Sequence, residues 1–90
     1  MIHGIITLGC LRTHRLPANE TRPERIVVSE DEQFGNEPRR MIIECRSDLT
    51  IRENHYRAAH KWLDKYNPGH RPMMPGLYFE GDYYWAWEAR

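Results

Sequence analysis

Gly76-Leu-Tyr-Phe-Glu-Gly-Asp-Tyr-Tyr-Trp-Ala-Trp-Glu-Ala-Arg90 is the stretch around which the rest of the chain is organised, and it holds six of the ten aromatic residues. Its Gly81-Asp82 pair is a turn signal of the kind that joins two strands in a tight hairpin. A turn at these residues would place Glu80 opposite Tyr83 and Phe79 opposite Tyr84. We therefore predict a C-terminal aromatic hairpin.

The predicted hairpin has two faces, because side chains alternate across a strand. Either the protein covers both faces itself, or one face stays exposed and meets a partner. Tyrosine and tryptophan suit such a surface, since they bring a large contact area at a small entropic cost. We therefore predict partner contacts from the second of the two faces. The first face carries Leu77, Phe79, Tyr84 and Ala86, and the second carries Tyr78, Glu80, Tyr83, Trp85 and Trp87.

Composition favours a single soluble domain, 1–90, with a modest core. Hydrophobic residues make up 40% of the chain, charged residues make up 29%, and the formal net charge is zero. A neutral chain is a poor general binder of nucleic acid, whose affinity depends on neutralising phosphates. The charges are nevertheless segregated, with an acidic segment at 30–37 and a mainly basic one at 38–75. This pattern fits electrostatic steering toward a protein partner.

The sequence predicts a cytoplasmic protein without a membrane span. Residues 1–8 are apolar but lack the basic start and cleavage site of a signal peptide. No apolar run approaches the ~20 residues that cross a bilayer. Cys10 and Cys45 do not make a disulfide framework, so we expect reduced thiols.

Short apolar runs predict strands at 2–8, 26–28 and 41–45, the last two forming a hairpin across a turn at 30–38. In the third run, Met41, Ile43 and Cys45 would face inward. Residues 11–25 lack periodicity and contain two prolines, so we predict a long loop there.

Thr50-Ile-Arg-Glu53 fits a capping box and predicts a helix over 51–66. The expected inward stripe, at helical spacing, consists of Tyr56, Ala59, Trp62, Leu63 and Tyr66. Basic residues follow the opposite side, where they would either be solvated or meet acidic groups on a partner; they are Arg57, Lys61 and Lys65. His55 lies beside the stripe and is expected to be a hydrogen-bonded core histidine. The predicted fold is α+β: a small, mostly antiparallel sheet with this amphipathic helix packed across it.

Asn67-Pro68-Gly69 should end the helix, because asparagine tolerates the left-handed conformation and proline cannot continue a helix. Pro68 either only terminates the helix or acts as a slow switch between two peptide isomers. The isomers of an X-Pro bond differ by only about 0.5–1 kcal/mol, so surrounding contacts can select one.

The sequence shows no spacing typical of an enzyme or a metal site. His55 and His60 are five residues apart, which separates them around a helix, and no phosphate loop or serine nucleophile motif is present. We therefore expect no catalysis, no cofactor and no metal.

Two functions remain open. One is a protein-binding module. The other is a nucleic-acid module that stacks bases on Tyr78, Tyr83, Trp85 and Trp87. The acidic residues among those aromatics count against the second function; they are Glu80, Asp82 and Glu88.

With dense arginine and exposed-looking aromatics, the chain resembles small phage-encoded host-inhibitor proteins, and among them the anti-RecBCD accessory proteins of lambdoid phages. The segment that aligns with this family is Asn67-Pro68-Gly69. The resemblance implies binding to the host recombination nuclease in the host cytoplasm. It also implies recruitment of a host prolyl isomerase through this proline-containing loop. The activity would be inhibition or modulation by protein–protein contact.

Overall fold

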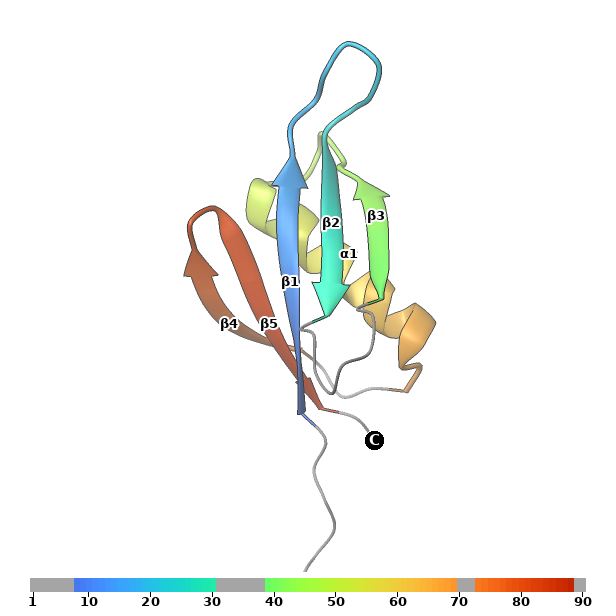
Figure 1. Cartoon of the computed structure of the whole chain (residues 1–90), viewed down its shortest axis with the longest axis vertical. Helices are drawn as coiled ribbons and strands as arrows, with labels where there is room; N and C mark the ends of the chain where they lie inside the picture. Colours follow the sequence, from blue (N-terminus) through green and yellow to red (C-terminus); the bar gives the residue numbers. More distant parts are fainter. Residues whose placement is uncertain (1–7, 31–38, 70–72, 89–90) are drawn as a thin grey trace, which may run out of the picture.

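The computed structural model describes residues 8–30, 39–69 and 73–88, and these form one five-stranded antiparallel sheet with a helix on one side (Figure 1). The predicted α+β fold is confirmed. The strand order is β3-β2-β1-β5-β4, so β1 is central and β3 and β4 are the two edges. In chain order the elements are β1 (Leu8–Leu16), β2 (Arg25–Glu30), β3 (Arg40–Glu44), α1 (Ile51–Tyr66), β4 (Met74–Phe79) and β5 (Asp82–Glu88).

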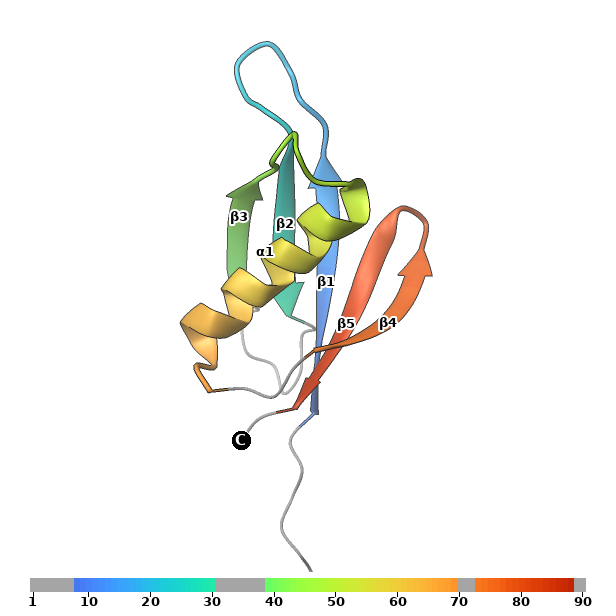
Figure 2. The same ribbon diagram turned by 180° about the vertical axis from the view of Figure 1, so that it is seen from behind.

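The helix begins and ends where the sequence predicted. The Glu53 amide donates to the Thr50 hydroxyl over 3.2 Å, and the Thr50 amide donates to the Glu53 carboxylate over 3.1 Å, which completes the capping box. At the other end, the Asn67 amide donates to the Leu63 carbonyl over 2.7 Å. From behind the sheet, α1 crosses β1, β2 and β3, while the β4–β5 hairpin lies beside it (Figure 2).

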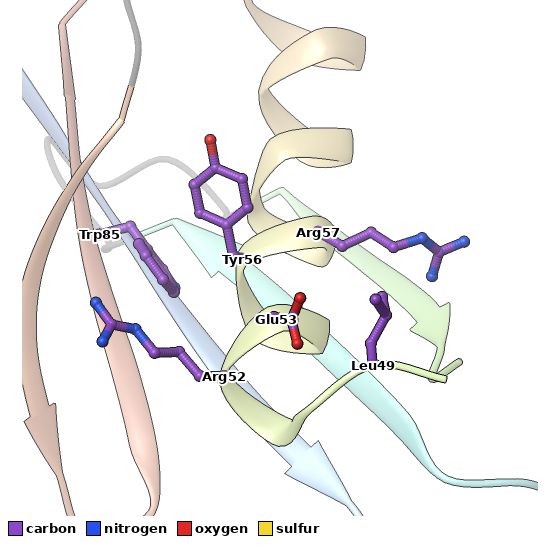
Figure 3. A pocket seen from close by; sticks show the side chains of 6 residues that line it. All are labelled: Leu49, Arg52, Glu53, Tyr56, Arg57 and Trp85. Carbon is purple, nitrogen blue, oxygen red and sulfur yellow. The ribbon is translucent and has the colours of Figure 1, made fainter. Parts of the chain in front are cut away.

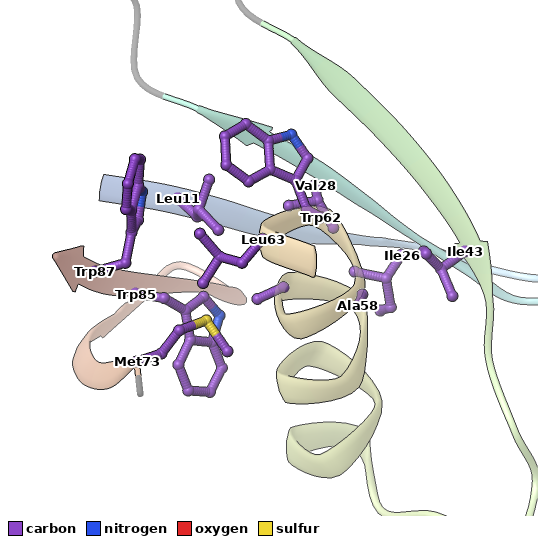
Figure 4. Close-up of a cluster of buried hydrophobic side chains, with 11 residues drawn as sticks. Leu11, Ile26, Val28, Ile43, Ala58, Trp62, Leu63, Met73, Trp85 and Trp87 are labelled. Atoms are coloured by element: carbon purple, nitrogen blue, oxygen red, sulfur yellow. The ribbon is translucent and has the colours of Figure 1, made fainter. Parts of the chain in front are cut away.

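The core lies between α1 and the sheet (Figure 4). The predicted inward positions of Ala59, Trp62 and Leu63 are confirmed, since all three are fully buried. Tyr56 was wrongly placed in the core: its side chain is 44% exposed, because the buried stripe is centred nearer to His55 and Ala58, which face β1 and β2. The buried hydrophobic residues are Leu11, Ile26, Val28, Ile43, Ala58, Ala59, Trp62, Leu63, Met73, Trp85 and Trp87.

The predicted loop over 11–25 is wrong at its beginning, because residues 11–16 belong to the central strand β1. Leu11 and Thr13 are buried under α1, whereas Arg12 and His14 are exposed on the other face. This alternation contains one aliphatic and one hydroxyl side chain on its inner face, a weak strand signal. Pairing with β2 on one side and β5 on the other overrides the weak local preference. The strand predicted at 2–8 lies outside the described residues, except for Leu8.

The predicted hairpin between 26–28 and 41–45 is confirmed as β2 and β3. Ile43 is buried and Ile42 is 57% exposed, as the predicted alternation requires. The turn predicted at 30–38 lies outside the described residues except for Glu30, since residues 31–38 are not described.

The aromatic hairpin is also present, but its turn lies one residue earlier than predicted. Phe79 pairs with Asp82 and Tyr78 pairs with Tyr83, so the two-residue loop is Glu80-Gly81. Both loop residues have positive φ, 51° and 85°, as a tight hairpin turn with the sheet's own twist requires. The actual pairing differs from the predicted one by two positions, so Tyr78 and Tyr83 still share a face, while Glu80 lies in the loop.

Candidate functional site

Exposed apolar and aromatic side chains gather between the N-terminal half of α1 and the β4–β5 hairpin. We call this surface the aromatic groove and define it by Ile51, Tyr56, Tyr78, Tyr83 and the edge of Trp85. Ile51 is 52% exposed and Tyr78 is 61% exposed. The groove exists because α1 crosses β1 to β3, where His55 packs on Tyr83, and leaves Tyr78 of the hairpin exposed.

The aromatic rings of the groove contact one another in an unbroken series. The ring centroids of Tyr78 and Tyr83 are 4.7 Å apart, and Tyr83 stacks on Trp85 at 6.0 Å. Tyr56, from the helix, meets Trp85 edge-on at 5.6 Å. Such pairs contribute about 0.5–1.5 kcal/mol beyond their buried area. The surface is therefore held in shape by its own rings before any partner arrives.

Two depressions lie along the groove. One, of about 410 Å³, is lined by Leu49, Arg52, Glu53, Tyr56, Arg57 and Trp85. In Figure 3, Arg52 and Trp85 lie on one side of the helix and Leu49 and Arg57 on the other, with Glu53 between them. The second depression, of about 360 Å³, lies at the hairpin tip, where Ile51 and His55 of α1 face Tyr78 and Tyr83.

A buried polar network fixes the floor of the groove around the Thr13 hydroxyl. His55 Nδ1 lies 2.8 Å from Thr13 Oγ1, and Trp85 Nε1 donates to the same oxygen over 3.0 Å. The Thr13 hydroxyl lies 3.3 Å from the Tyr83 carbonyl oxygen, to which it can donate. These contacts tie α1, β1 and β5 together, so the network positions the aromatic rings above it.

His55 is the core histidine that the sequence predicted, with no exposed surface. Its Nδ1 is hydrogen-bonded, but its Nε2 is buried without a hydrogen-bond partner among the described residues. Burial lowers the pKa of the His55 imidazole, and the nearby Asp82 carboxylate opposes part of that effect. The ring is therefore neutral at pH 7 and acts as a positioning group for the groove.

The opposite face of the hairpin carries a charged cluster around Asp82. Its carboxylate lies 3.1 Å from the Arg12 guanidinium and 2.6 Å from His14 Nδ1. These contacts anchor the hairpin tip to β1 on the side away from α1.

The structure divides the predicted hairpin contacts into two groups. Tyr78 and Tyr83 line the groove. Trp85 and Trp87, however, are only 2% and 7% exposed, so apart from the edge of Trp85 they offer a partner little surface. Trp85 is hydrogen-bonded to Thr13, and Trp87 packs 6.1 Å from the Trp62 ring. Both are core residues because they lie on the part of the face that α1 reaches.

The predicted basic side of α1 does not join the hairpin tyrosines. Lys61 and Lys65 are exposed, and Lys65 Nζ lies 5.2 Å from the ring of Tyr66. Arg57 lines the larger depression, but its guanidinium donates to the Glu44 carbonyl over 3.1 Å at the opposite edge of the sheet. The three cations thus do not form one surface with Tyr78.

Asn67-Pro68-Gly69 follows the C-terminal end of α1, at the end of the helix away from the groove. Pro68 and Gly69 are exposed. The expectation of a left-handed Asn67 is wrong: its φ is −140°, and Gly69 adopts positive φ instead, at 82°. Glycine adopts this conformation without a steric penalty, so Asn67 does not need to adopt it.

Sequence reasoning missed two residues of the site, Tyr56 and Thr13. Tyr56 fell within the apolar stripe, and the stripe alone gives no sign of where the sheet under a helix stops. Thr13 lay in a segment interpreted as a loop. The signal that could have found it was its spacing, two residues after Leu11 in a run of otherwise polar side chains.

Comparisons with protein-family models, curated proteins and solved structures find no match for this chain. Within the described ranges, no three histidine, cysteine or acidic side chains gather as metal ligands. The described helix is neither long nor apolar enough to span a bilayer.

Proposed function

We propose that this chain is a non-enzymatic protein-binding module and that the aromatic groove is its contact surface. The observation that carries the proposal is the exposure of Tyr78, 61%, on top of a pre-formed series of aromatic rings. Aromatic residues in a central, rigid position dominate the energy of many protein interfaces, because little conformational freedom is lost on binding. Arg52 and Glu53 border the same groove and would orient the partner.

A nucleic-acid module is the weaker alternative. Base stacking needs exposed rings, and two of the four predicted stacking residues, Trp85 and Trp87, are buried. The remaining two, Tyr78 and Tyr83, line the hairpin-tip depression together with Glu80, whose carboxylate would repel a phosphate backbone. The formal net charge of zero adds no general attraction for phosphates.

The resemblance to phage host-inhibitor proteins supplies the first target to test: a host DNA-processing nuclease of the RecBCD type. In this proposal the chain inhibits or modulates the nuclease by contact alone, in the host cytoplasm. The exposed Pro68 supports the second part of the resemblance, a contact with a host prolyl isomerase, since an enzyme must reach the bond on which it acts.

Two neighbouring hairpin residues provide a matched test. Tyr78 and Phe79 are exposed to similar extents, 61% and 55%, but alternate to opposite faces of the hairpin. Tyr78→Ala should weaken binding to the purified nuclease at least about tenfold, the loss typical of an interface aromatic. Phe79→Ala should bind like the wild type. Equal effects of the two substitutions would exclude the groove as the contact surface.

The same preparations separate the two functional classes. Filter binding to single-stranded DNA at two salt concentrations should show no retention above background. Salt-sensitive retention that is lost in Tyr78→Ala would favour the nucleic-acid module instead.

For the proline loop, nuclease binding of the wild type should accelerate when a prolyl isomerase is added, and that of Pro68→Ala should not. Indifference of the wild type to the isomerase would remove this part of the proposal.

A further inference from the structure

The edge strand β3 directs some of its backbone hydrogen-bonding groups away from the sheet. Immediately beyond the paired strands, the Glu30 amide donates to the Arg39 carbonyl over 3.4 Å, and the Cys45 amide donates to the Glu24 carbonyl over 2.9 Å. Antiparallel pairing alternates, so residues 39, 41, 43 and 45 direct their backbone groups toward β2. Arg40, Ile42 and Glu44 therefore direct theirs away from the sheet.

The other edge of the sheet is built differently. In β4, Pro75 has no amide hydrogen to donate, and the register with β5 is irregular between Pro75 and Tyr78. A proline and an irregular register are two devices that keep an edge strand from pairing with another chain. The β3 segment Arg40–Glu44 contains no proline, and its register with β2 is regular. Among the described residues, the β4 edge thus carries two devices against strand addition and the β3 edge carries neither of them.

The sequence of β3, Arg40-Met-Ile-Ile-Glu44, is complementary to itself in the antiparallel direction. If two copies pair about Ile42, Arg40 of each lies opposite Glu44 of the other. All three outward-directed residues then form hydrogen-bonded pairs, with Ile42 opposite Ile42 at the centre. Their side chains share the sheet face that α1 does not cover, where Ile42 is 57% exposed and both charged residues are exposed.

We propose that β3 is a homodimer interface in which two copies join edge to edge into one continuous antiparallel sheet. The occupant is a second copy, because charge and backbone pattern match in a single register. Opposite charges facing each other across strands stabilise such pairs and like charges destabilise them. The interface is separate from the aromatic groove, so it can be present or absent independently of the proposed function.

The helix accommodates such an added strand. Arg57 donates to the Glu44 carbonyl over 3.1 Å, and a carbonyl oxygen has a second lone pair for the incoming amide. The Trp62 indole donates to the Arg39 carbonyl, which already faces β2, so it blocks none of the outward groups. In Figures 1 and 2 the C-terminal end of α1 extends past β3. A strand added beside the Arg40 end of β3 would therefore lie over this end of the helix.

Charge reversal with mixing is the decisive experiment. Sedimentation equilibrium of the wild type, from micromolar to millimolar concentration, should show a reversible monomer–dimer transition. Arg40→Glu alone places four carboxylates at the interface, and Glu44→Arg alone places four guanidinium groups there. Each variant should dimerise at least about tenfold more weakly than the wild type. An equimolar mixture of the two should recover the wild-type affinity, because every opposed pair is again of opposite charge.

The double substitution R40E/E44R should also dimerise like the wild type, and Phe79→Ala, at the protected end of the sheet, should change nothing. Amide hydrogen exchange of the wild type gives a second readout that needs no variant: exchange at Arg40, Ile42 and Glu44 should slow as the concentration rises. A wild type that stays monomeric, single variants that dimerise normally, or a mixture that does not recover would each overturn the proposal. A dimer whose Ile42 amide exchanges at the same rate at every concentration would place the interface elsewhere.

Discussion

The same face of the sheet is core at one end and surface at the other. Under α1, Leu11 and Val28 have no exposed surface. On the hairpin, Tyr78 points to the same side of the sheet and is 61% exposed. The difference is one of coverage, since α1 packs across β1, β2 and β3 and on the hairpin reaches Tyr83 and Trp85, whereas Tyr78 stays exposed. Whether an aromatic residue stabilises this fold or is available to a partner therefore depends on where the helix stops.

The change from core to surface runs along the hairpin, and the residue types follow it. Trp87 and Trp85 are buried, Tyr83 is half-buried and Tyr78 is exposed. Tyrosine has a hydroxyl group that water can satisfy, so it suits a site that is open before binding and closed after it. The gradient separates residues that should affect stability from residues that should affect binding.

Leu63→Ala tests the covered end and should have the largest effect on stability. Leu63 is fully buried in the core, so its truncation leaves a cavity and should lower the free energy of unfolding by about 2–5 kcal/mol. Urea denaturation measures this loss. Lys61→Ala, on the exposed side of the same helix, is the control and should stay within about 0.5 kcal/mol of wild type. A loss below about 1 kcal/mol for Leu63→Ala would overturn the facing of α1.

Gly9→Ala tests the buried end of the aromatic gradient. A Cβ atom on Gly9 would lie 2.2 Å from the Trp87 ring, so the indole has to move. Overpacking of this kind costs about 1–3 kcal/mol. In a Trp87→Leu background the added methyl group has room, so the extra cost of Gly9→Ala should largely disappear. Equal costs in both backgrounds would show that Trp87 does not pack on Gly9.

The sequence predicted the parts of the molecule whose signals are local. The capping box of α1 depends on two side chains three residues apart, and both of its ends were found. The tight hairpin depends on Gly81, and it was placed to within one residue. In contrast, β1 is a strand because β2 and β5 flank it, and no local pattern reports that pairing.

The limits of the site prediction have the same cause. Tyr78 and Trp85 lie on the same face of the hairpin and are both aromatic, so strand alternation alone places them in one group. Their separation into surface and core depends on the angle at which α1 crosses the sheet. The helix is held in place where Trp62 and Leu63 share one buried cluster with Leu11 of β1 and Val28 of β2, contacts that no pattern within the hairpin reports.

His55, at the boundary between the two ends, should make stability depend on pH. Its pKa is lowered in the folded protein, chiefly by burial, whereas in the unfolded chain it is near 6.5. Above that pH the imidazole is neutral in both states and no penalty arises. As the pH falls below about 6.5, the unfolded chain binds the proton first, so the free energy of unfolding decreases toward the folded-state pKa.

The measurement is urea unfolding of wild type and His55→Gln between pH 7.5 and 5. The wild type should lose more stability over this range than the variant. Parallel slopes for the two proteins would mean that His55 is not held neutral by the fold.

Tyr78→Ala should have the smallest effect on stability, although it should have the largest effect on partner binding. The side chain is mostly exposed and, among the described residues, contacts the ring of Tyr83, so its removal should change the free energy of unfolding by no more than about 0.5–1 kcal/mol. Phe79→Ala should cost a similar amount, since Phe79 is comparably exposed on the opposite face. The two variants would then differ in binding and not in folding.

Urea unfolding of the two variants, measured together with the wild type, tests whether Tyr78 contributes to the stability of the fold or is available to a partner. A loss well above 1 kcal/mol for Tyr78→Ala alone would mean that this tyrosine closes the core at the hairpin tip, as Trp85 does further along. The aromatic rings would then be a structural cluster, and the contrast between the two ends would disappear. Equal, small losses would leave the exposed ring with no role in holding the fold together.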